Sequence, residues 1–220
     1  MNIVWDKLVE IFGINEDYTA NSSSGEQRKE LLDHLDLREW YEDLPSETQR
    51  QIRQSKNVVG IGGGEANLLD QKMLSSGSMT QQDFLAGVVK HAAKEGDIQF
   101  AEEVLPKALS ANGRSIENEH FMYNSLIKAY YKERNNRDDA IEKCIEYCKR
   151  DISIIDEFLS SWNGDPPRIP SFKRLAIIYE KKGEYEKAAE ICNKAIDRNL
   201  SDKTKGGFEG RKQRILNKMD

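Results

Sequence analysis

Apolar residues in the C-terminal part of the chain recur three and four positions apart, a spacing that places their side chains on one face of an α-helix. From about residue 80, this pattern defines pairs of helices of similar length, separated by short polar turns. Such a series predicts an all-α fold made of helical hairpins. A single hairpin cannot bury its apolar face alone, so the hairpins are expected to stack as repeats around a continuous core.

The clearest unit covers residues 170–196. Its first helix carries Phe172, Leu175, Ala176 and Tyr179, its turn carries Gly183, and its second helix carries Ala188, Cys192 and Ala195. Alanine lets two helix backbones approach closely while larger side chains fill the remaining space, and glycine suits the turn. This pattern resembles the tetratricopeptide repeat (TPR), a helical hairpin motif of about 34 residues. Cys192 stands where that family usually has an aromatic residue, and Leu200 where it usually has a proline.

Two further units precede the clearest one. The middle unit matches the motif at Tyr123, Leu126, Tyr130 and Ala140 and has an enlarged turn at Asn135–Asn136. The first, weaker unit has Leu85, Val88, Val89 and Ala92 on one helix, Gly96–Asp97 in the turn, and Ala101, Leu105 and Ala108 on the other. Three units reach the usual minimum for a stable stack. Residues 152–162 are predicted to extend the second helix of the middle unit, and residues 163–167 to make a long break after it.

The segments on either side of the repeats have different patterns. Residues 203–218 predict a polar capping helix with Phe208, Ile215 and Leu216 facing inward. Residues 1–25 predict an amphipathic helix at 3–12 and a flexible, Ser-rich linker. Residues 26–79 predict short helices over 31–41 and from Ser46 onward, and a Gly-rich loop at 57–64, which pack on the repeat domain of residues 80–220. The resemblance implies a right-handed α-α superhelix, a TPR-like solenoid of about three helical hairpins with a C-terminal capping helix and extra N-terminal helices.

The resemblance also implies where a ligand would bind, because the first helices of such repeats line a concave groove that receives the family's ligands. The side chains expected to face this groove are Lys90, Lys94, Asn124, Lys128, Tyr131, Lys132, Lys173, Arg174 and Lys181. This set predicts a basic groove that favours an acidic ligand or a chain-terminal carboxylate. The alternative is that these are ordinary solvated cations, since a register error of one position rotates a side chain by about 100° around the helix. A carboxylate clamp is not predicted, because Ala86 stands where its first lysine is expected.

The net charge of −5 is unevenly distributed, because residues 1–56 hold 7 Lys or Arg and 12 Asp or Glu. All of the acidic excess therefore precedes the basic groove in sequence. One hypothesis is that the N-terminal helix docks into the groove of its own chain or of a neighbour. The alternative is that residues 26–56 simply pack on the repeats and keep a solvated acidic face.

Other candidate sites have weaker support. Cys144 and Cys148 are four residues apart, a spacing that can hold a metal, but Cys144 and Cys192 fall at packing positions of the repeats, so buried thiols are predicted instead of a zinc site. The run Gly60–Gly64 lacks the strand, helix and lysine of a phosphate-binding loop, so no nucleotide or other cofactor is expected. The three histidines lie in separate segments, away from any nucleophile motif. An odd number of cysteines and the lack of a long apolar run favour a cytoplasmic protein that does not enter a membrane.

The sequence as a whole predicts a non-catalytic module or adaptor that binds a peptide or protein segment, with acidic segments as candidates, in the concave groove. The alternative is a nucleic-acid-binding or peptide-sensing regulatory protein that uses the same groove. The pI of about 5.5 disfavours nucleic acid. An enzyme built around the Gly60–Gly64 loop is a further alternative, and the sequence leaves the oligomeric state open.

Overall fold

The computed structural model describes residues 29–54, 72–73, 79–164 and 168–219. These residues form helices, apart from an antiparallel pairing of the two-residue strands β1 (Lys29–Glu30) and β2 (Lys72–Met73). The helices are α2 (Leu31–His34), α3 (Arg38–Glu42), α4 (Ser46–Gln54), α5 (Gln81–Glu95), α6 (Ile98–Ser110), α7 (Ile116–Lys132), α8 (Ala140–Ser153), α9 (Ile155–Ser161), α10 (Pro170–Lys181), α11 (Tyr185–Ile196) and α12 (Gly207–Leu216). The predicted all-α fold is confirmed. The predicted helix at 3–12, the linker that follows it and the Gly-rich loop at 57–64 lie outside the described residues.

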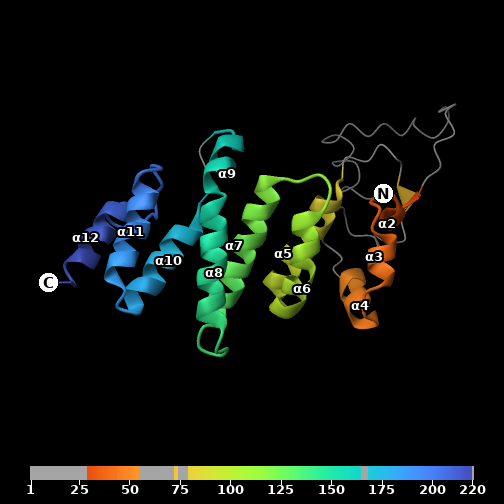
Figure 1. Cartoon of the computed structure of the whole chain (residues 1–220), viewed down its shortest axis with the longest axis horizontal. Coiled ribbons are helices and arrows are strands. Elements are labelled where there is room, and N and C mark those ends of the chain that lie inside the picture. Colours follow the sequence, from red (N-terminus) through yellow and green to blue (C-terminus); the bar gives the residue numbers. More distant parts are fainter. Residues whose placement is uncertain (1–28, 55–71, 74–78, 165–167, 220) are drawn as a thin grey trace, which may run out of the picture.

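Three antiparallel hairpins follow one another along the molecule, formed by α5 with α6, α7 with α8, and α10 with α11 (Figure 1). They coincide with the three predicted repeat units. The turns at Gly96 and Gly183 have φ values of 94° and 74°, a left-handed conformation that glycine adopts without strain. At one end of the series α12 packs against α11, and at the other end lie α2, α3 and α4. No helix among the described residues has both the length and the apolar character needed to cross a bilayer.

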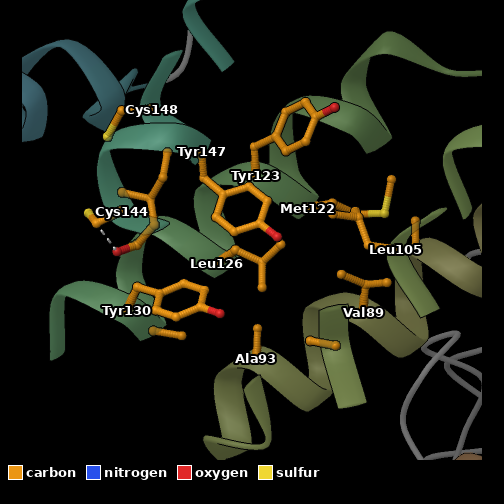
Figure 2. Packing of buried hydrophobic residues seen from close by; sticks show 14 of the residues in the cluster. Val89, Ala93, Leu105, Met122, Tyr123, Leu126, Tyr130, Cys144, Tyr147 and Cys148 are labelled. Atoms are coloured by element: carbon orange, nitrogen blue, oxygen red, sulfur yellow. Dashed lines mark hydrogen bonds between the residues drawn. The ribbon is translucent and has the colours of Figure 1, made fainter. Parts of the chain in front are cut away.

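One hydrophobic core runs through the hairpins, from Leu31 to Ile215. Figure 2 shows its central part, where Val89 and Leu105 of the first hairpin face Met122 and Leu126 of α7. The middle hairpin closes around stacked tyrosine rings, because the ring centroids of Tyr130 and Tyr147 lie 5.8 Å apart. The core is continuous across the junctions, so each hairpin stabilises the next, as expected of stacked repeats.

Small residues occupy the predicted positions of closest helix approach. Ala176 of α10 and Ala188 and Ala195 of α11 are all 0% exposed. We expect Ala176→Leu to lower the free energy of unfolding by about 2 kcal/mol, because a larger side chain forces the packed helices apart. Urea unfolding followed by circular dichroism measures this loss. The matched change Lys181→Leu, on the exposed face of the same helix, should stay within about 0.5 kcal/mol of the original; equal losses for the two variants would argue against close packing at Ala176.

Two helix boundaries differ from the sequence prediction. Of residues 152–162, only the first two extend α8, because the chain leaves the helix at Ile154 and starts the separate helix α9. This break lets Phe158 of α9 stack on His120 of α7, at 4.0 Å between ring centroids. The predicted helix over 31–41 is likewise divided into α2 and α3 at Asp36, whose φ of 53° interrupts the helix.

The two junctions between hairpins are not equivalent. Across the first junction, α7 packs on α5 more than on α6, so the first helices of the first two hairpins lie directly side by side. Across the second junction, α10 packs on α8 and touches α7 only marginally. The first helices therefore form a continuous wall from α5 to α7, while long side chains connect α7 to α10.

Candidate functional site

The nine residues predicted to line the groove lie on α5, α7 and α10 and fall into two sets. Five of them make contacts within the protein: Lys90, Asn124, Tyr131, Lys173 and Arg174. The other four side chains are exposed: Lys94, Lys128, Lys132 and Lys181. The first set holds neighbouring elements together, and only the second set is fully available to a ligand.

Lys90 takes part in a polar network that joins α5 to α7. Its Nζ donates to Oδ1 of Asn118 at 3.4 Å, and Nδ2 of Asn118 donates to Oδ1 of Asp83 at 2.8 Å. Burial lowers the pKa of Lys90, while the charge of Asp83 opposes that shift. Burial would raise the pKa of Asp83, but hydrogen bonds from Thr80 and Asn118 outweigh it and leave that pKa lowered. Lys90 is thus a half-buried structural cation.

Asn124 belongs to a buried chain of hydrogen bonds between α7 and α8. Its Nδ2 lies 2.8 Å from Nε2 of His120, and Nδ1 of His120 lies 2.7 Å from Oδ1 of Asp151. A neutral imidazole with its proton on Nδ1 satisfies both contacts, because it donates to the carboxylate and accepts from the amide. His120 and Asp151 are both 0% exposed. The arrangement fixes the spacing of the two helices inside the middle hairpin.

Tyr131 and Arg174 connect the second hairpin to the third. The guanidinium carbon of Arg174 lies 3.5 Å from the centroid of the Tyr131 ring, and that of Arg134 lies 4.6 Å from the same centroid. Two cations therefore contact one aromatic ring, a favourable arrangement because the face of the ring is electron-rich. The contact of Arg174 with Tyr131 bridges the junction where α7 and α10 barely touch.

Lys173 holds the loop that leads into the C-terminal cap. Its Nζ donates to the backbone oxygen of Asp202 at 3.1 Å. The carboxylate of Asp202 in turn accepts from Thr204 at Oδ1 and from Arg211 of α12 at Oδ2. Lys173 therefore stabilises the packing of the cap against the third hairpin.

The four exposed lysines lie toward the C-terminal ends of parallel helices. Lys94, Lys132 and Lys181 each belong to the last turn of their helix, and Lys128 lies one turn before Lys132 on α7. Because α5, α7 and α10 run in the same direction, their last turns follow one edge of the array (Figure 1). A cation in the last turn also offsets the negative end of the helix dipole. These lysines therefore stabilise their helices and also present positive charge to the solvent. We call these four residues the lysine row.

The cysteines behave as apolar packing groups, as the sequence predicted. Cys144, Cys148 and Cys192 are all buried and unbridged, and Cys144 points its sulfur toward the backbone oxygen of Ile127 (Figure 2). Burial raises the pKa of Cys192 to about 11, so this thiol stays protonated at neutral pH. Among the described residues, no three His, Cys, Asp or Glu side chains gather where they could hold a metal ion.

Sequence reasoning missed two features of the structure. The first is the pairing of His120 with Asp151, which are 31 residues apart and lie on different helices. The second is a cleft between α8, α10 and α11. A signal for the first was the presence of polar His120 and Asp151 on faces that otherwise carry apolar residues. Nothing in the periodicity indicated the second, because it depends on the angle at which α10 meets α8.

Comparisons with known proteins give no functional description. No family model matches the chain, and no solved structure matches it. The chain is 26% identical over 197 residues to an uncharacterized protein of Aquifex aeolicus (strain VF5), and the alignment covers 86% of this chain and 93% of that protein. The similarity thus runs through most of both proteins, but the relative's description names no activity, ligand or partner.

Proposed function

We propose that this protein is a non-catalytic, TPR-like interaction module that binds an acidic segment of a partner protein along the lysine row. The observation that carries the proposal is the exposure of Lys94, Lys128, Lys132 and Lys181 on three successive parallel helices. A superhelical arrangement of the hairpins, with α5, α7 and α10 on its concave side, would place this row on the face where TPR-like repeats receive their ligands.

The internal contacts support this role because they hold the row in place. The Asp83–Asn118–Lys90 network joins the first two hairpins, and the stack of Arg174 on Tyr131 joins the second to the third. A row of like charges on a rigid support matches a ligand with several carboxylates better than separate mobile lysines would, because less freedom is lost on binding. The exposed positive charges of the four lysines also speed the approach of an oppositely charged partner.

Charge reversal on α7 tests the proposal. The experiment is affinity capture from the cells that make the protein, with the intact chain and with the variant Lys128→Glu/Lys132→Glu as baits. The variant should retain the partners of the intact chain about tenfold less well, since two lost contacts remove on the order of 1.4 kcal/mol from the free energy of binding. The control is Lys203→Glu/Lys205→Glu, which makes the same charge change at exposed positions before α12. It should retain the partners, and higher salt should weaken their binding to the intact protein.

Equal capture by the intact protein and both variants would exclude the lysine row as the binding surface. Capture of nucleic acid, with steep salt dependence that only the α7 variant removes, would instead favour the alternative of a nucleic-acid-binding protein. Arg174 is unsuitable for such a test, because its guanidinium group is packed on Tyr131 and its replacement would disturb the junction itself.

A further inference from the structure

A second surface lies away from the lysine row, in a cleft of about 520 Å³ between α8, α10 and α11. It is lined by Lys149, Ile152, Ser153, Leu175, Tyr179, Lys187, Glu190, Ile191 and Lys194. Its floor is apolar but has a small exposed area, since Leu175, Tyr179 and Ile191 are each at most 7% exposed and half-buried Ile152 adjoins them. A volume in this range accommodates a small molecule or several side chains of a docked peptide.

The rim of the cleft carries three exposed lysines, Lys149 from α8 and Lys187 and Lys194 from α11. Lys194 pairs with Glu190 at 2.8 Å, and Lys187 pairs with Glu184 at 2.5 Å. The hydrogen bond from Lys187 lowers the pKa of Glu184, and the charges of Lys182 and Lys149 add to that effect. Carboxylates are therefore favoured at this rim. Exposed pairs within one helix are weak, so these lysines can exchange their partners for carboxylates of a ligand.

An apolar floor under a cationic rim fits a segment that is both amphipathic and acidic. The first 18 residues of this chain have that composition. Their apolar residues at helical spacing are Ile3, Val4, Leu8, Ile11 and Phe12, and their charged residues are Asp6, Lys7, Glu10, Glu16 and Asp17. The spacing of the rim lysines also suits a helical ligand. Lys187 and Lys194 are seven residues apart on α11, which is about 10 Å along the axis and equals two turns of such a ligand.

We propose that residues 1–18 of one copy of the protein dock in the α8–α10–α11 cleft of a second copy, with their apolar side chains on the floor and their carboxylates at Lys149, Lys187 and Lys194. A second copy is the favoured source for a geometric reason. Residues 19–28 span at most about 35 Å when fully extended, and the described chain begins beyond α5 and α7, at the end of the array opposite to α11 (Figure 1). A segment from another molecule reaches the cleft without that constraint.

Docking of this kind is head-to-tail, because the segment and the cleft are different surfaces. Such contacts continue into longer chains or closed rings instead of stopping at a symmetric dimer. The full-length protein should therefore show a weight-average mass that rises with concentration and passes that of a dimer. This inference does not depend on the proposed function, since the cleft and the lysine row share no residue.

Sedimentation velocity of the full chain between about 1 and 500 μM, a range chosen for contacts of micromolar strength, tests the proposal. The expected result is self-association in the intact protein and its loss both in Leu8→Glu, which alters only the segment, and in Lys149→Glu/Lys187→Glu, which alters only the rim. A mixture of these two variants keeps one intact segment and one intact cleft. It should form a heterodimer, in which the segment of the rim variant occupies the cleft of Leu8→Glu. This heterodimer should grow no further, because the remaining segment and the remaining cleft are the altered ones.

The mixture does not show that the rim variant is folded, because an unfolded rim variant would still present an intact segment. Unchanged helical content by circular dichroism is therefore required of the rim variant. Lys128→Glu/Lys132→Glu should self-associate like the intact protein, which separates this proposal from the one on the lysine row. A protein that stays monomeric over the whole range, or a symmetric dimer that neither Leu8→Glu nor the rim variant affects, would overturn the proposal.

Discussion

Replacing His120 by leucine is expected to lower the free energy of unfolding by about 3–5 kcal/mol, the range for a buried charge that is left without its partner. The carboxylate of Asp151 is 0% exposed and would lose its hydrogen bond from His120. Its other oxygen, Oδ2, already finds no hydrogen-bond partner within the described part of the protein. The variant would also remove the ring on which Phe158 stacks, so α8 and α9 would each lose one contact with α7.

The double variant His120→Leu/Asp151→Leu is the matched control. Apolar residues of similar size often replace a buried polar pair at little cost, so the double variant should recover most of the stability that the single variant loses. Urea unfolding followed by circular dichroism gives both values. A loss below about 1 kcal/mol in His120→Leu, the size of an ordinary surface effect, would show that the pair does not hold the middle hairpin together.

Replacing Asp202 by alanine is expected to lower the free energy of unfolding by about 3 kcal/mol, the lower end of the range for removing one partner of a buried ion pair. The carboxylate is 0% exposed and lies 2.9 Å from the guanidinium group of Arg211, which is itself nearly buried in the cap. The exposed pair of Arg198 with Asp156 provides the control, because Asp156→Ala removes a similar contact at 2.7 Å from the surface. That variant should cost no more than about 1 kcal/mol.

The same carboxylate makes part of the stability depend on pH. Burial would raise the pKa of Asp202, but hydrogen bonds from Thr204 and Arg211 outweigh it, so the pKa in the folded protein is lowered. A lowered pKa in the folded state contributes stability that is present above the unfolded-state value of about 3.9 and is lost as the pH falls through the lower folded value. Unfolding at a series of pH values should therefore show a shallower acid-side loss in Asp202→Ala than in the intact protein; parallel curves would contradict this account.

The helices of the hairpins could be predicted from sequence because their signals are local. Apolar spacing, Gly96 and Gly183 located α5, α6, α10 and α11, and the alanines identified the faces that pack. The start of α9 could not be predicted in the same way. The residues after Ile152 suit a helix, and the break at Ile154 accompanies a contact of Phe158 with His120 on another helix, which local spacing does not reveal.

The lining of the groove was harder to predict than the helices that carry it. Periodicity gives the face of a helix on which Lys90 or Arg174 lies, but it does not say what the neighbouring helix offers. Lys90 is hydrogen-bonded to Asn118, and Arg174 is stacked on the ring of Tyr131. These contacts depend on the packing of one hairpin on the next, which differs between the two junctions. For the same reason the α8–α10–α11 cleft left no trace in the sequence pattern.

Photo-crosslinking along the lysine row tests most directly whether these four residues bind a partner. A photoreactive amino acid is placed singly at Lys94, Lys128, Lys132 and Lys181 in the native cell, and at the exposed control positions Lys203 and Lys205. If an acidic partner binds along the lysine row, the four positions on α5, α7 and α10 should all crosslink to one partner, within a segment rich in aspartate and glutamate, and the controls should not. Crosslinks to that partner from the control positions alone, or none from any of the four, would contradict binding along the row.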